Sequence, residues 1–273
     1  FIVLPRFDHS GPIKGAVAIA NFLCKYYSTT IIFLKKNNYD YRLELDKRIN
    51  VHCLGRYNYF SKFKIARKLI RQYQHERSIL FSMCFSADIF SLLLDNYSFK
   101  ISSIRSNLVK NYSYTYSFLG FFLAYIHLYI QNLFNLTIVM NNKMFKQVKS
   151  YSRNRIISIN NFIEENKLLN LFKKNIPSSK RISFIYVGGL NKRKDPFSLI
   201  KAFEKICFKN NFILHIIGNG PLLKKIHFYI NKKNLNKHII MHGFLRSPYE
   251  LLSESDVFVL PSHAEGTPRA AME

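Results

Sequence analysis

Acidic residues are scarce in this sequence of 273 residues. Its 16 Asp and Glu stand against 41 Lys and Arg, so the formal net charge is 41 − 16 = +25. A surplus of this size favours an anionic partner, such as nucleic acid, an anionic membrane or a phosphorylated small molecule. The alternative is compositional bias, because Lys, Asn, Ile, Phe and Tyr are all frequent, as an AT-rich genome produces. No nucleic-acid-binding module is recognisable and the charge is spread along the chain, which disfavours nucleic acid.

Cysteine is scarce as well. The four cysteines, Cys24, Cys53, Cys84 and Cys207, lie far apart, and no C-x-x-C sequence occurs. This spacing argues against a disulfide scaffold and against a cysteine-rich zinc site, and it fits reduced, buried thiols in a cytosolic protein. Hydrophobic residues make up 48% of the chain, so it can bury a core and is not disordered as a whole.

Two common phosphate-binding motifs are missing. No G-x-x-x-x-G-K-[ST] sequence occurs, and Gly218–Gly220 lacks the third glycine of a dinucleotide fingerprint, so NAD is not expected. We interpret Gly218–Gly220 as a turn before a helix with Pro221 at its first position, with direct ligand contact as the alternative. Gly11 has two readings as well, a tight turn or a close approach to phosphates. His238 and His242 share a strand face without an acidic or thiol partner, so no metal is expected.

Apolar runs of strand length recur along the chain, at 1–5, 30–34, 49–54, 78–83, 101–104, 136–140, 155–159, 182–187, 212–217, 238–243 and 256–261. Helix-like stretches separate most of them, for example 13–26, 60–75, 196–208, 221–232 and 248–254. This alternation predicts parallel α/β sheets covered by helices on both faces.

The polar segment 160–181 separates the strands into two series. We therefore expect two doubly wound domains, 1–165 and 166–273. The chain opens on a strand pattern and ends within a helix pattern, so we expect a fragment whose second domain is incomplete.

The segment 118–140 is apolar and long enough to cross a bilayer. Polar residues inside it, among them His127 and Gln131, are costly in lipid, so a core helix followed by a strand is favoured. A helix lying in the membrane interface and a true membrane span are the alternatives.

The predicted helix 60–75 is basic on one side, at Lys64, Lys68, Arg71 and His75. Apolar residues gather on another side, at Phe63, Ala66, Leu69, Ile70 and Tyr73. We interpret the basic side as a solvated face over a buried stripe. Docking onto anionic lipid is the alternative, because basic amphipathic helices often rest on such surfaces.

The most informative stretch is 261–273, PSHAEGTPRAAME. A strand pattern runs into a loop that holds Glu265 and Gly266, and a helix is expected to start near Thr267–Pro268. Glu273 follows Glu265 by eight residues, which is roughly 12 Å at the rise per residue of a helix. Two carboxylates with a helix N-terminus between them suit a ligand with hydroxyl groups at both ends and an anion in the middle, such as a nucleoside diphosphate sugar. The alternative is that both glutamates are exposed surface acids.

The frame around these glutamates resembles the signature of retaining glycosyltransferases of family four, which have the GT-B fold. Three other stretches agree with the family in order and spacing: YVGGLNKRKDPFSLIKAF (186–203), IIGNGPLLKKI (216–226) and HGFLRSPYELLSESDVFVLPS (242–262). In the first half, DHSGPIKGAVAIANFL (8–23) resembles the family's glycine-rich first loop and helix. The resemblance covers nearly all of the chain and is more specific in the second half.

The resemblance implies two Rossmann-like domains facing across a cleft, the first for the acceptor and the second for the donor. Glu265 would contact the donor sugar near the reacting centre, Glu273 would bind the ribose, and Lys194 would neutralise the leaving diphosphate. Gly266, Thr267 and Pro268 would bring the backbone close to the phosphates. Gly11 is the remaining candidate donor-binding residue, with a tight turn that opens a helix as its alternative role.

The sequence departs from the family at two points. The family usually has Arg where Gly189 stands, and Arg193 is the candidate to replace that cation. The family's frequent first-domain histidine is also missing, because no histidine lies between His75 and His127.

The activity that the resemblance implies is transfer of a hexose-type sugar, with retention, from a UDP- or GDP-sugar to a lipid-linked acceptor. The product would be a surface polysaccharide such as capsule or lipopolysaccharide. The enzyme would need no metal or other cofactor and would work in the cytoplasm at the inner face of the plasma membrane, in peripheral contact with anionic lipid. The alternatives are a basic nucleic-acid-binding protein and an inactive, membrane-associated relic of the enzyme.

Overall fold

The computed structural model describes residues 1–8, 10–36, 40, 44–72, 78–94, 98–163, 181–208 and 210–273. The chain divides into two compact units. The N-terminal unit consists of Phe1–Ser113 and Ser117–Asn161, and the C-terminal unit consists of Tyr114–Tyr116 and Phe162–Glu273. The domain boundary expected between residues 165 and 166 falls outside the described residues.

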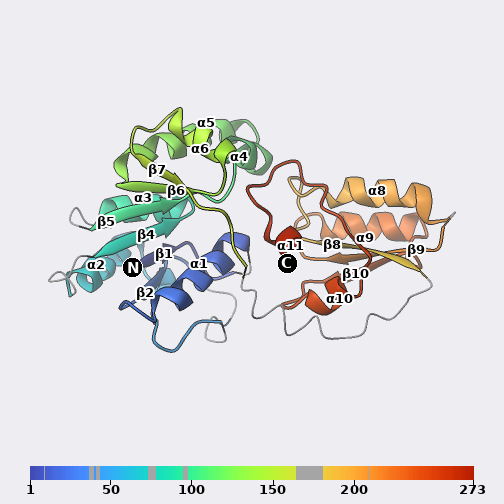
Figure 1. Cartoon of the computed structure of the whole chain (residues 1–273), viewed down its shortest axis with the longest axis horizontal. Coiled ribbons are helices and arrows are strands. Elements are labelled where there is room, and N and C mark those ends of the chain that lie inside the picture. The colour runs from blue at the N-terminus through green and yellow to red at the C-terminus, as the bar shows by residue number, and fades with distance from the viewer. Residues whose placement is uncertain are drawn as a thin grey trace. The chain divides into compact units, whose positions relative to one another are not determined.

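The N-terminal unit is built on a seven-stranded parallel sheet (Figure 1). Its strands are β1 (Ile2–Leu4), β2 (Thr30–Phe33), β3 (Asn50–Cys53), β4 (Ile79–Met83), β5 (Phe99–Ser103), β6 (Leu136–Val139) and β7 (Arg155–Ser158). They lie in the order β3-β2-β1-β4-β5-β6-β7, so the order reverses at β1. This is the doubly wound arrangement that the alternating pattern predicts.

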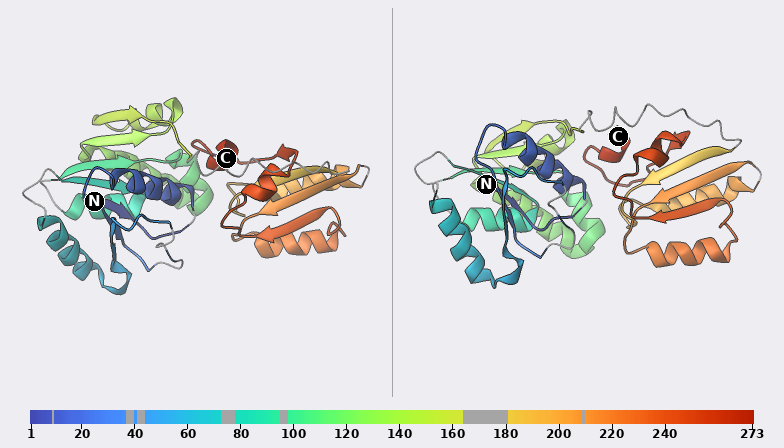
Figure 2. Two further views of the ribbon diagram at one scale, coloured as in Figure 1. Left: turned by 60° about the horizontal axis from the view of Figure 1, so that its bottom comes forward. Right: turned by 90° about the horizontal axis from the view of Figure 1, so that it is seen from below.

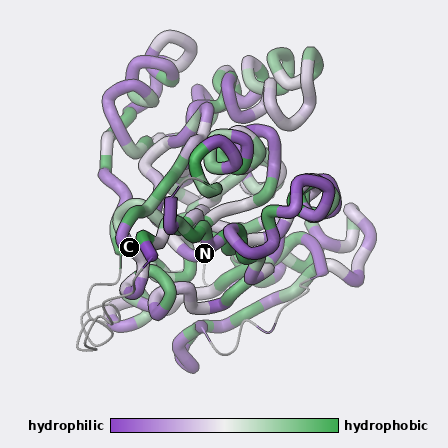
Figure 3. The backbone as a smooth tube through the Cα atoms, turned by 90° about the vertical axis from the view of Figure 1, so that its right-hand side faces the viewer, coloured by the Kyte–Doolittle hydropathy of each residue, from purple (hydrophilic) through white to green (hydrophobic). Residues whose placement is uncertain are grey.

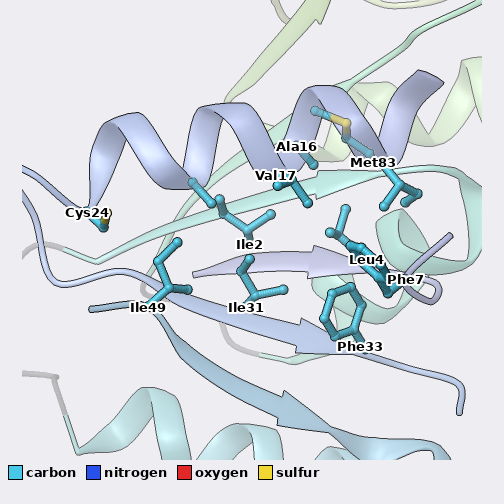
Figure 4. Close-up of a cluster of buried hydrophobic side chains, with 12 residues drawn as sticks. Ile2, Leu4, Phe7, Ala16, Val17, Cys24, Ile31, Phe33, Ile49 and Met83 are labelled. Carbon is cyan, nitrogen blue, oxygen red and sulfur yellow. The ribbon is translucent and has the colours of Figure 1, made fainter. Parts of the chain in front are cut away.

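Helices cover both faces of this sheet. The α-helices are α1 (Gly11–Leu23), α2 (Tyr59–Arg71), α3 (Phe85–Leu94), α4 (Leu108–Tyr116), α5 (Phe118–Ile130) and α6 (Asn142–Lys149). Among the described residues, short 3-10 helices η2 (Leu54–Arg56) and η3 (Gln131–Leu133) follow β3 and α5. On one face, α1 packs its apolar side against β1 and β2, where Ile13, Ala16, Val17 and Ala20 meet Ile2, Leu4, Ile31 and Phe33 (Figure 4).

The opposite face of β1 and β2 is covered by α2 and α3. Val3 and Ile32 point to this side because side chains alternate along a strand. They form a second core with Ala66 and Ile70 of α2 and with Leu80, Ala87, Phe90 and Leu94. Strands covered on both faces are therefore confirmed for this unit.

Residues 118–140 fold as α5, then η3, then β6. A helix followed by a strand is therefore confirmed over the alternative of one long span. Gln131 is buried but fully engaged, because its side chain donates to His127 O at 3.2 Å and accepts from Thr137 Oγ1 at 3.0 Å. Among the described residues, no helix has the length and apolar character needed to cross a membrane.

Helix α2 is amphipathic, as its sequence predicts. The Asn58 side chain caps it by accepting a hydrogen bond from Ser61 N at 2.8 Å. Ala66 and Ile70 are buried, whereas Lys64, Lys68 and Arg71 are exposed. Tyr73 and His75, also assigned to this helix from the sequence, lie outside the described residues.

The four cysteines are free thiols in different environments. Cys24 and Cys207 are buried as expected, whereas Cys84 is half-buried and Cys53 is exposed. The expectation of buried thiols is wrong for Cys53, because it lies at the end of β3, which is an edge strand of the sheet formed by the described residues.

The C-terminal unit contains a four-stranded parallel sheet in the order β10-β9-β8-β11. The strands are β8 (Ile182–Val187), β9 (Phe212–Ile217), β10 (Ile239–Gly243) and β11 (Val257–Phe258). Figures 1 and 2 show α8 (Pro196–Cys207) and α9 (Leu223–Lys232) on one face and α10 (Tyr249–Ser253) on the other. The last helix is α11 (Arg269–Met272).

The core of this unit lies between the sheet and the helix pair α8 and α9. It is formed by Tyr186, Leu190, Ile200, Phe203, Cys207, Leu214, Ile216, Ile226, Ile230, Leu235 and Ile239. Hydrophobic and hydrophilic residues alternate along the helices in Figure 3, as expected of helices with one buried side.

Candidate functional site

Two loops of the C-terminal unit leave the same edge of its sheet. The strand order reverses at β8, which pairs with β9 on one side and with β11 on the other. Open α/β sheets bind ligands at such a switch point, outside the carboxyl ends of the strands. The loops after β8 and β11, residues 188–195 and 259–268, are therefore where a ligand is expected.

Lys194 and Arg193 in the first loop contact Glu265 in the second. Lys194 Nζ forms an ion pair with Glu265 Oε1, and Arg193 Nη1 lies 3.4 Å from Glu265 Oε2. Arg193 Nη1 also donates a 2.6 Å hydrogen bond to Ala264 O. The three charged side chains are only 16–22% exposed. The structure thus brings together three of the residues singled out in the sequence.

Neighbouring residues fix these two loops against each other. His263 N donates to Arg193 O at 2.9 Å, and His263 Nε2 lies 3.1 Å from Asp195 Oδ2. Asn191 Oδ1 accepts a 3.0 Å hydrogen bond from Lys194 N. Sequence reasoning missed Asn191, Asp195 and His263. The signal that could have identified them is that polar residues follow both β8 and β11, which are neighbours in the sheet.

Asp195 starts α8 directly after Lys194. Its backbone is left-handed, with φ 46° and ψ 49°, and its side chain accepts from Ser198 N at 3.3 Å. Pro196 is the first helical residue, where a missing N–H costs nothing. The positive end of the α8 dipole therefore begins one residue after the Lys194 cation.

Burial shifts the pKa of two groups at this site. Desolvation lowers the pKa of Lys194, although the Glu265 carboxylate beside it acts in the opposite direction. The pKa of Tyr186 is raised, chiefly by burial and further by the negative charge of Glu265. The Tyr186 hydroxyl donates to Gly189 O at 3.0 Å, so it stabilises the loop after β8.

The loop after β9 packs closely against the loop after β8. Gly218 has φ +147°, and a Cβ there would lie 1.9 Å from Gly188 O. A Cβ on Gly220 would lie 2.4 Å from Leu190 O. These contacts support the turn interpretation of Gly218–Gly220. Pro221 lies two residues before Leu223, the first residue of α9, and not at the first helical position.

Gly189 and Gly11 are less closely packed than Gly218 and Gly220. A Cβ on Gly189 would meet only the Asn191 amide at 3.0 Å and Asn219 O at 3.9 Å, and φ is not positive. Gly11 opens α1 in the N-terminal unit, and a Cβ there meets nothing within 4 Å. Neither position therefore requires glycine for packing or backbone conformation.

Glu273 is not paired with Lys194 or Arg193. Its Oε1 lies 3.4 Å from Arg269 Nη2, and both side chains are nearly buried. Helix α11 begins at Arg269, so Pro268 precedes the first turn and does not open it. The spacing of roughly 12 Å assumed a continuous helix, whereas Glu265, Gly266 and Thr267 lie before α11.

Two buried polar atoms belong to, or lie close in the sequence to, the Arg269–Glu273 ion pair. Ser262 Oγ and Arg269 Nη1 have no hydrogen-bond partner among the residues that the structure describes. Such atoms are costly unless a ligand or water engages them.

His242 meets His215, not His238. The His215 Nδ1 and His242 Nε2 atoms are 2.9 Å apart, and burial lowers the pKa of both rings. Within the described part of the chain, no group of three or more His, Cys, Asp or Glu side chains could hold a metal ion.

Residues 166–273 match the family model described as "Glycosyl transferases group 1". Over these residues the chain is similar to the glycosyl transferases of group 1. The match includes both loops of the site, with Lys194, Arg193 and Glu265, and the Arg269–Glu273 pair.

Two curated relatives agree with this family. The chain is 27% identical over 223 residues to an uncharacterized glycosyltransferase of Methanocaldococcus jannaschii, covering 76% of this chain and 54% of that protein. It is 36% identical over 108 residues to the UDP-Gal:alpha-D-GlcNAc-diphosphoundecaprenol alpha-1,3-galactosyltransferase of Escherichia coli, covering 37% of this chain and 28% of that protein. The chain thus spans about half, or less, of the length of these relatives.

A solved structure extends the likeness to both units. HepE of Anabaena, in complex with UDP and glucose, has a TM-score of 0.71 and 14% sequence identity, covering 96% of this chain and 74% of that one. The prediction of a GT-B fold built from α/β units is therefore confirmed.

Proposed function

We propose that the chain is part of a glycosyltransferase that takes a hexose-type sugar from a nucleoside diphosphate donor. The observation that carries this proposal is the contact of Lys194 and Arg193 with Glu265 at the switch point of the C-terminal sheet. Two cations suit a diphosphate, and a carboxylate suits the hydroxyl groups of a sugar. The UDP-Gal named for the Escherichia coli relative is a nucleoside diphosphate sugar, and the UDP held by HepE is the nucleoside diphosphate part of such a donor.

The ion pair suggests how donor binding and catalysis are linked. Without donor, Glu265 balances part of the charge of Lys194 and Arg193. An arriving diphosphate competes for these cations and frees the carboxylate to accept hydroxyl hydrogen bonds from the sugar. As the sugar departs, negative charge grows on the diphosphate. Lys194, Arg193 and the N-terminus of α8 stabilise that charge without rearrangement.

The other donor contacts follow from the resemblance. Glu273 would bind the ribose, which requires it to leave or share its contact with Arg269. Gly266, Thr267, Pro268 and Gly11 would bring the backbone close to the phosphates. We propose retention of configuration and no metal requirement, since Lys194 and Arg193 supply positive charge at the leaving group.

A lipid-linked sugar is the proposed acceptor. The Escherichia coli relative is named for transfer to a sugar on diphosphoundecaprenol. An acceptor of this kind is anchored in a membrane, so we propose that the protein works in the cytoplasm at the inner face of the plasma membrane. The product would be a surface polysaccharide, and the net charge of +25 would favour contact with anionic lipid.

Calorimetric titration of the full chain with UDP and GDP tests the donor site. We expect one nucleotide to bind and Lys194→Met to weaken it by about tenfold or more, which corresponds to about 1.4 kcal/mol. Lys192→Met is the matched control, because Lys192 lies in the same loop but is exposed. Equal affinity in both variants would refute the assignment, and tighter binding of duplex DNA than of either nucleotide would favour the nucleic-acid alternative.

A further inference from the structure

The outer face of α5 presents large apolar side chains to solvent. Phe118, Phe122 and Tyr129 are 86%, 67% and 71% exposed. Together with Tyr125 and Leu133 they form a row that we name the α5 stripe. Their spacing of four, three, four and four residues places them on one side of α5 and its continuation in η3. Isolated exposed apolar residues are ordinary, but a contiguous row indicates an interaction surface.

The buried side of α5 fixes this orientation. Ala124 and Leu128 pack into a core with Leu108, Met144 and Val148. His127, which is 2% exposed, points inward, where its Nε2 lies 2.7 Å from Asp88 Oδ2 and its Nδ1 lies 2.7 Å from the Tyr112 hydroxyl. Rotation of α5 to bury its aromatic row would break this buried pair, which is costly. The aromatic face is therefore held outward by the fold.

The sequence around α5 lacks negative charge. Residues 96–163 contain no Asp or Glu, although the overall frequency of 16 in 273 would place about 68 × 16/273, or four, in such a stretch. The same stretch contains eight basic residues: Lys100, Arg105, Lys110, Lys143, Lys146, Lys149, Arg153 and Arg155. The last five of these and Lys110 are exposed.

Part of this basic surface adjoins the α5 stripe. Tyr151, just after α6, makes an edge contact with Tyr125, with ring centroids 5.4 Å apart. Asn132 donates to Tyr151 O and accepts from Arg153 N, at 2.9 and 2.8 Å. Lys149 and Arg153 flank Tyr151 in the sequence, so they lie at the border of the stripe. Lys146 lies one helical turn before Lys149 on α6 (Asn142–Lys149), and we name Lys146, Lys149 and Arg153 the basic rim.

We propose that the α5 stripe and the basic rim dock the N-terminal unit onto the surface of an anionic lipid bilayer. Phe and Tyr side chains favour the interface between headgroups and acyl chains, and lysine and arginine are attracted to anionic headgroups. With 13 residues, α5 is too short to cross a bilayer but long enough to lie in its surface. The inference rests on the membrane contact included in the proposed function and assigns that contact to a surface.

Helix α2, the alternative surface, has a different character. Its exposed face is basic at Lys64, Lys68 and Arg71, but its large exposed apolar side chains, Tyr59 and Phe60, are confined to its first two residues. Charge alone gives a weaker and more salt-sensitive contact than charge combined with apolar burial. We therefore expect α2 to contribute less than α5.

Co-sedimentation of the full chain with vesicles tests the assignment. The vesicles contain phosphatidylcholine alone or with phosphatidylglycerol, each at low and high salt. Three combined variants are compared: Phe118→Ser/Phe122→Ser/Tyr129→Ser in the stripe, Lys146→Gln/Lys149→Gln/Arg153→Gln in the rim, and Lys64→Gln/Lys68→Gln/Arg71→Gln in α2 as the matched control. Far-UV circular dichroism and nucleotide affinity show that each variant is folded and that its donor site is intact.

We expect the wild type to bind the anionic vesicles and to lose affinity at high salt. The stripe and rim variants should each bind at least about tenfold more weakly with unchanged nucleotide affinity, and the α2 variant by less than about threefold. If the wild type binds but only the α2 variant is impaired, the assignment to α5 is wrong and the membrane contact stands. If the wild type does not bind anionic vesicles, both the membrane contact and its assignment to α5 are wrong. Nucleotide binding still tests the donor site independently. A lipid-free wild-type dimer that the stripe variant dissociates would make the stripe an interface between chains and overturn the proposal.

Discussion

Lys194 and Glu265 form an ion pair that joins the loops after the adjacent strands β8 and β11. Arg193 approaches the same carboxylate, so two cations face one anion before any ligand is bound. Lys194 and Arg193 lie next to the N-terminus of α8, whose positive end favours an anion and is capped by the Asp195 carboxylate. This charge balance leads to the first three predictions.

Nucleotide affinity should depend on alkaline pH through Lys194. Burial lowers the pKa of Lys194, so its charge is lost below the ordinary lysine value of 10.5. UDP or GDP affinity should fall as pH rises through this lowered pKa, and Lys194→Arg should flatten the decline because arginine stays charged. Folding stability should change in the opposite direction, rising with pH in the same window, because the unfolded chain keeps a proton that the folded chain releases. Calorimetric titrations over a pH series would measure the first effect, and identical profiles for both proteins would contradict it.

Glu265→Gln should separate binding from turnover. The change removes the charge that competes with a diphosphate for Lys194, so nucleotide affinity should stay the same or rise. Sugar transfer by the full-length enzyme should fall by about a hundredfold, because the carboxylate acts on the sugar near the reacting centre. Glu204→Gln, on α8 in contact with Tyr229 and Lys233, is the control that should retain activity. A proportional loss of affinity and turnover in Glu265→Gln would argue for a purely structural role.

Gly189→Arg should strengthen nucleotide binding. The position has an ordinary backbone conformation, and an added side chain meets mainly the Asn191 amide, which can move. A third cation at the phosphates should improve affinity by about tenfold, or about 1.4 kcal/mol. Gly189→Met is the control for side-chain volume, and calorimetry is the measurement. A loss of affinity in both variants would show that the loop needs the space.

Gly218→Ala should destabilise the C-terminal unit strongly. The added Cβ would lie 1.9 Å from Gly188 O and the backbone has φ +147°, so both packing and conformation oppose it. We expect a loss of about 3 kcal/mol or more in the free energy of unfolding. Gly243→Ala has φ +67° but open space around the Cβ, so it should cost only about 1 kcal/mol. Urea unfolding followed by far-UV circular dichroism would compare the two variants.

Asp88→Ala should destabilise the N-terminal unit. The Asp88 carboxylate accepts hydrogen bonds from Ser82 Oγ at 2.6 Å and Ser102 Oγ at 2.8 Å, and it contacts His127. Its removal leaves these buried groups without their partner, and we expect a loss of about 3–5 kcal/mol. Asp46→Ala, which removes a surface pair with Arg48, should change the urea midpoint little. Equal midpoints for the two variants would contradict the importance of the buried pair.

The sequence was most informative where strands are buried on both faces. The runs 182–187 and 212–217 match β8 and β9 residue for residue, because a central parallel strand is apolar along most of its length. The run 256–261 is longer than β11, which pairs only with β8 over two residues before the chain turns toward the site. Apolar character alone does not distinguish a paired strand from the loop that continues it.

The candidate site was predictable in its charged residues but not in its supports. Lys194 and Glu265 belong to motifs of known spacing, whereas the hydrogen bond from His263 N to Arg193 O depends on loop conformations that include the left-handed Asp195. The side of α5 that faces the core was not predictable from the sequence either. Its apolar sequence favours burial on every side, and the choice of buried side depends on His127 meeting Asp88, a residue 39 positions away.

The central position of β1 has a consequence for how the N-terminal unit folds. Ile2 pairs with Ile31 on one side and with Phe81, 81 − 2 = 79 residues later, on the other. At 5–20 residues per second, the ribosome makes β4 about 4–16 s after β1. During that interval the β1–β2 pair has an open, apolar edge, which is a template for incorrect strand pairing. The centre of the sheet is therefore completed late, and a chaperone that covers this edge would protect the nascent chain during the delay.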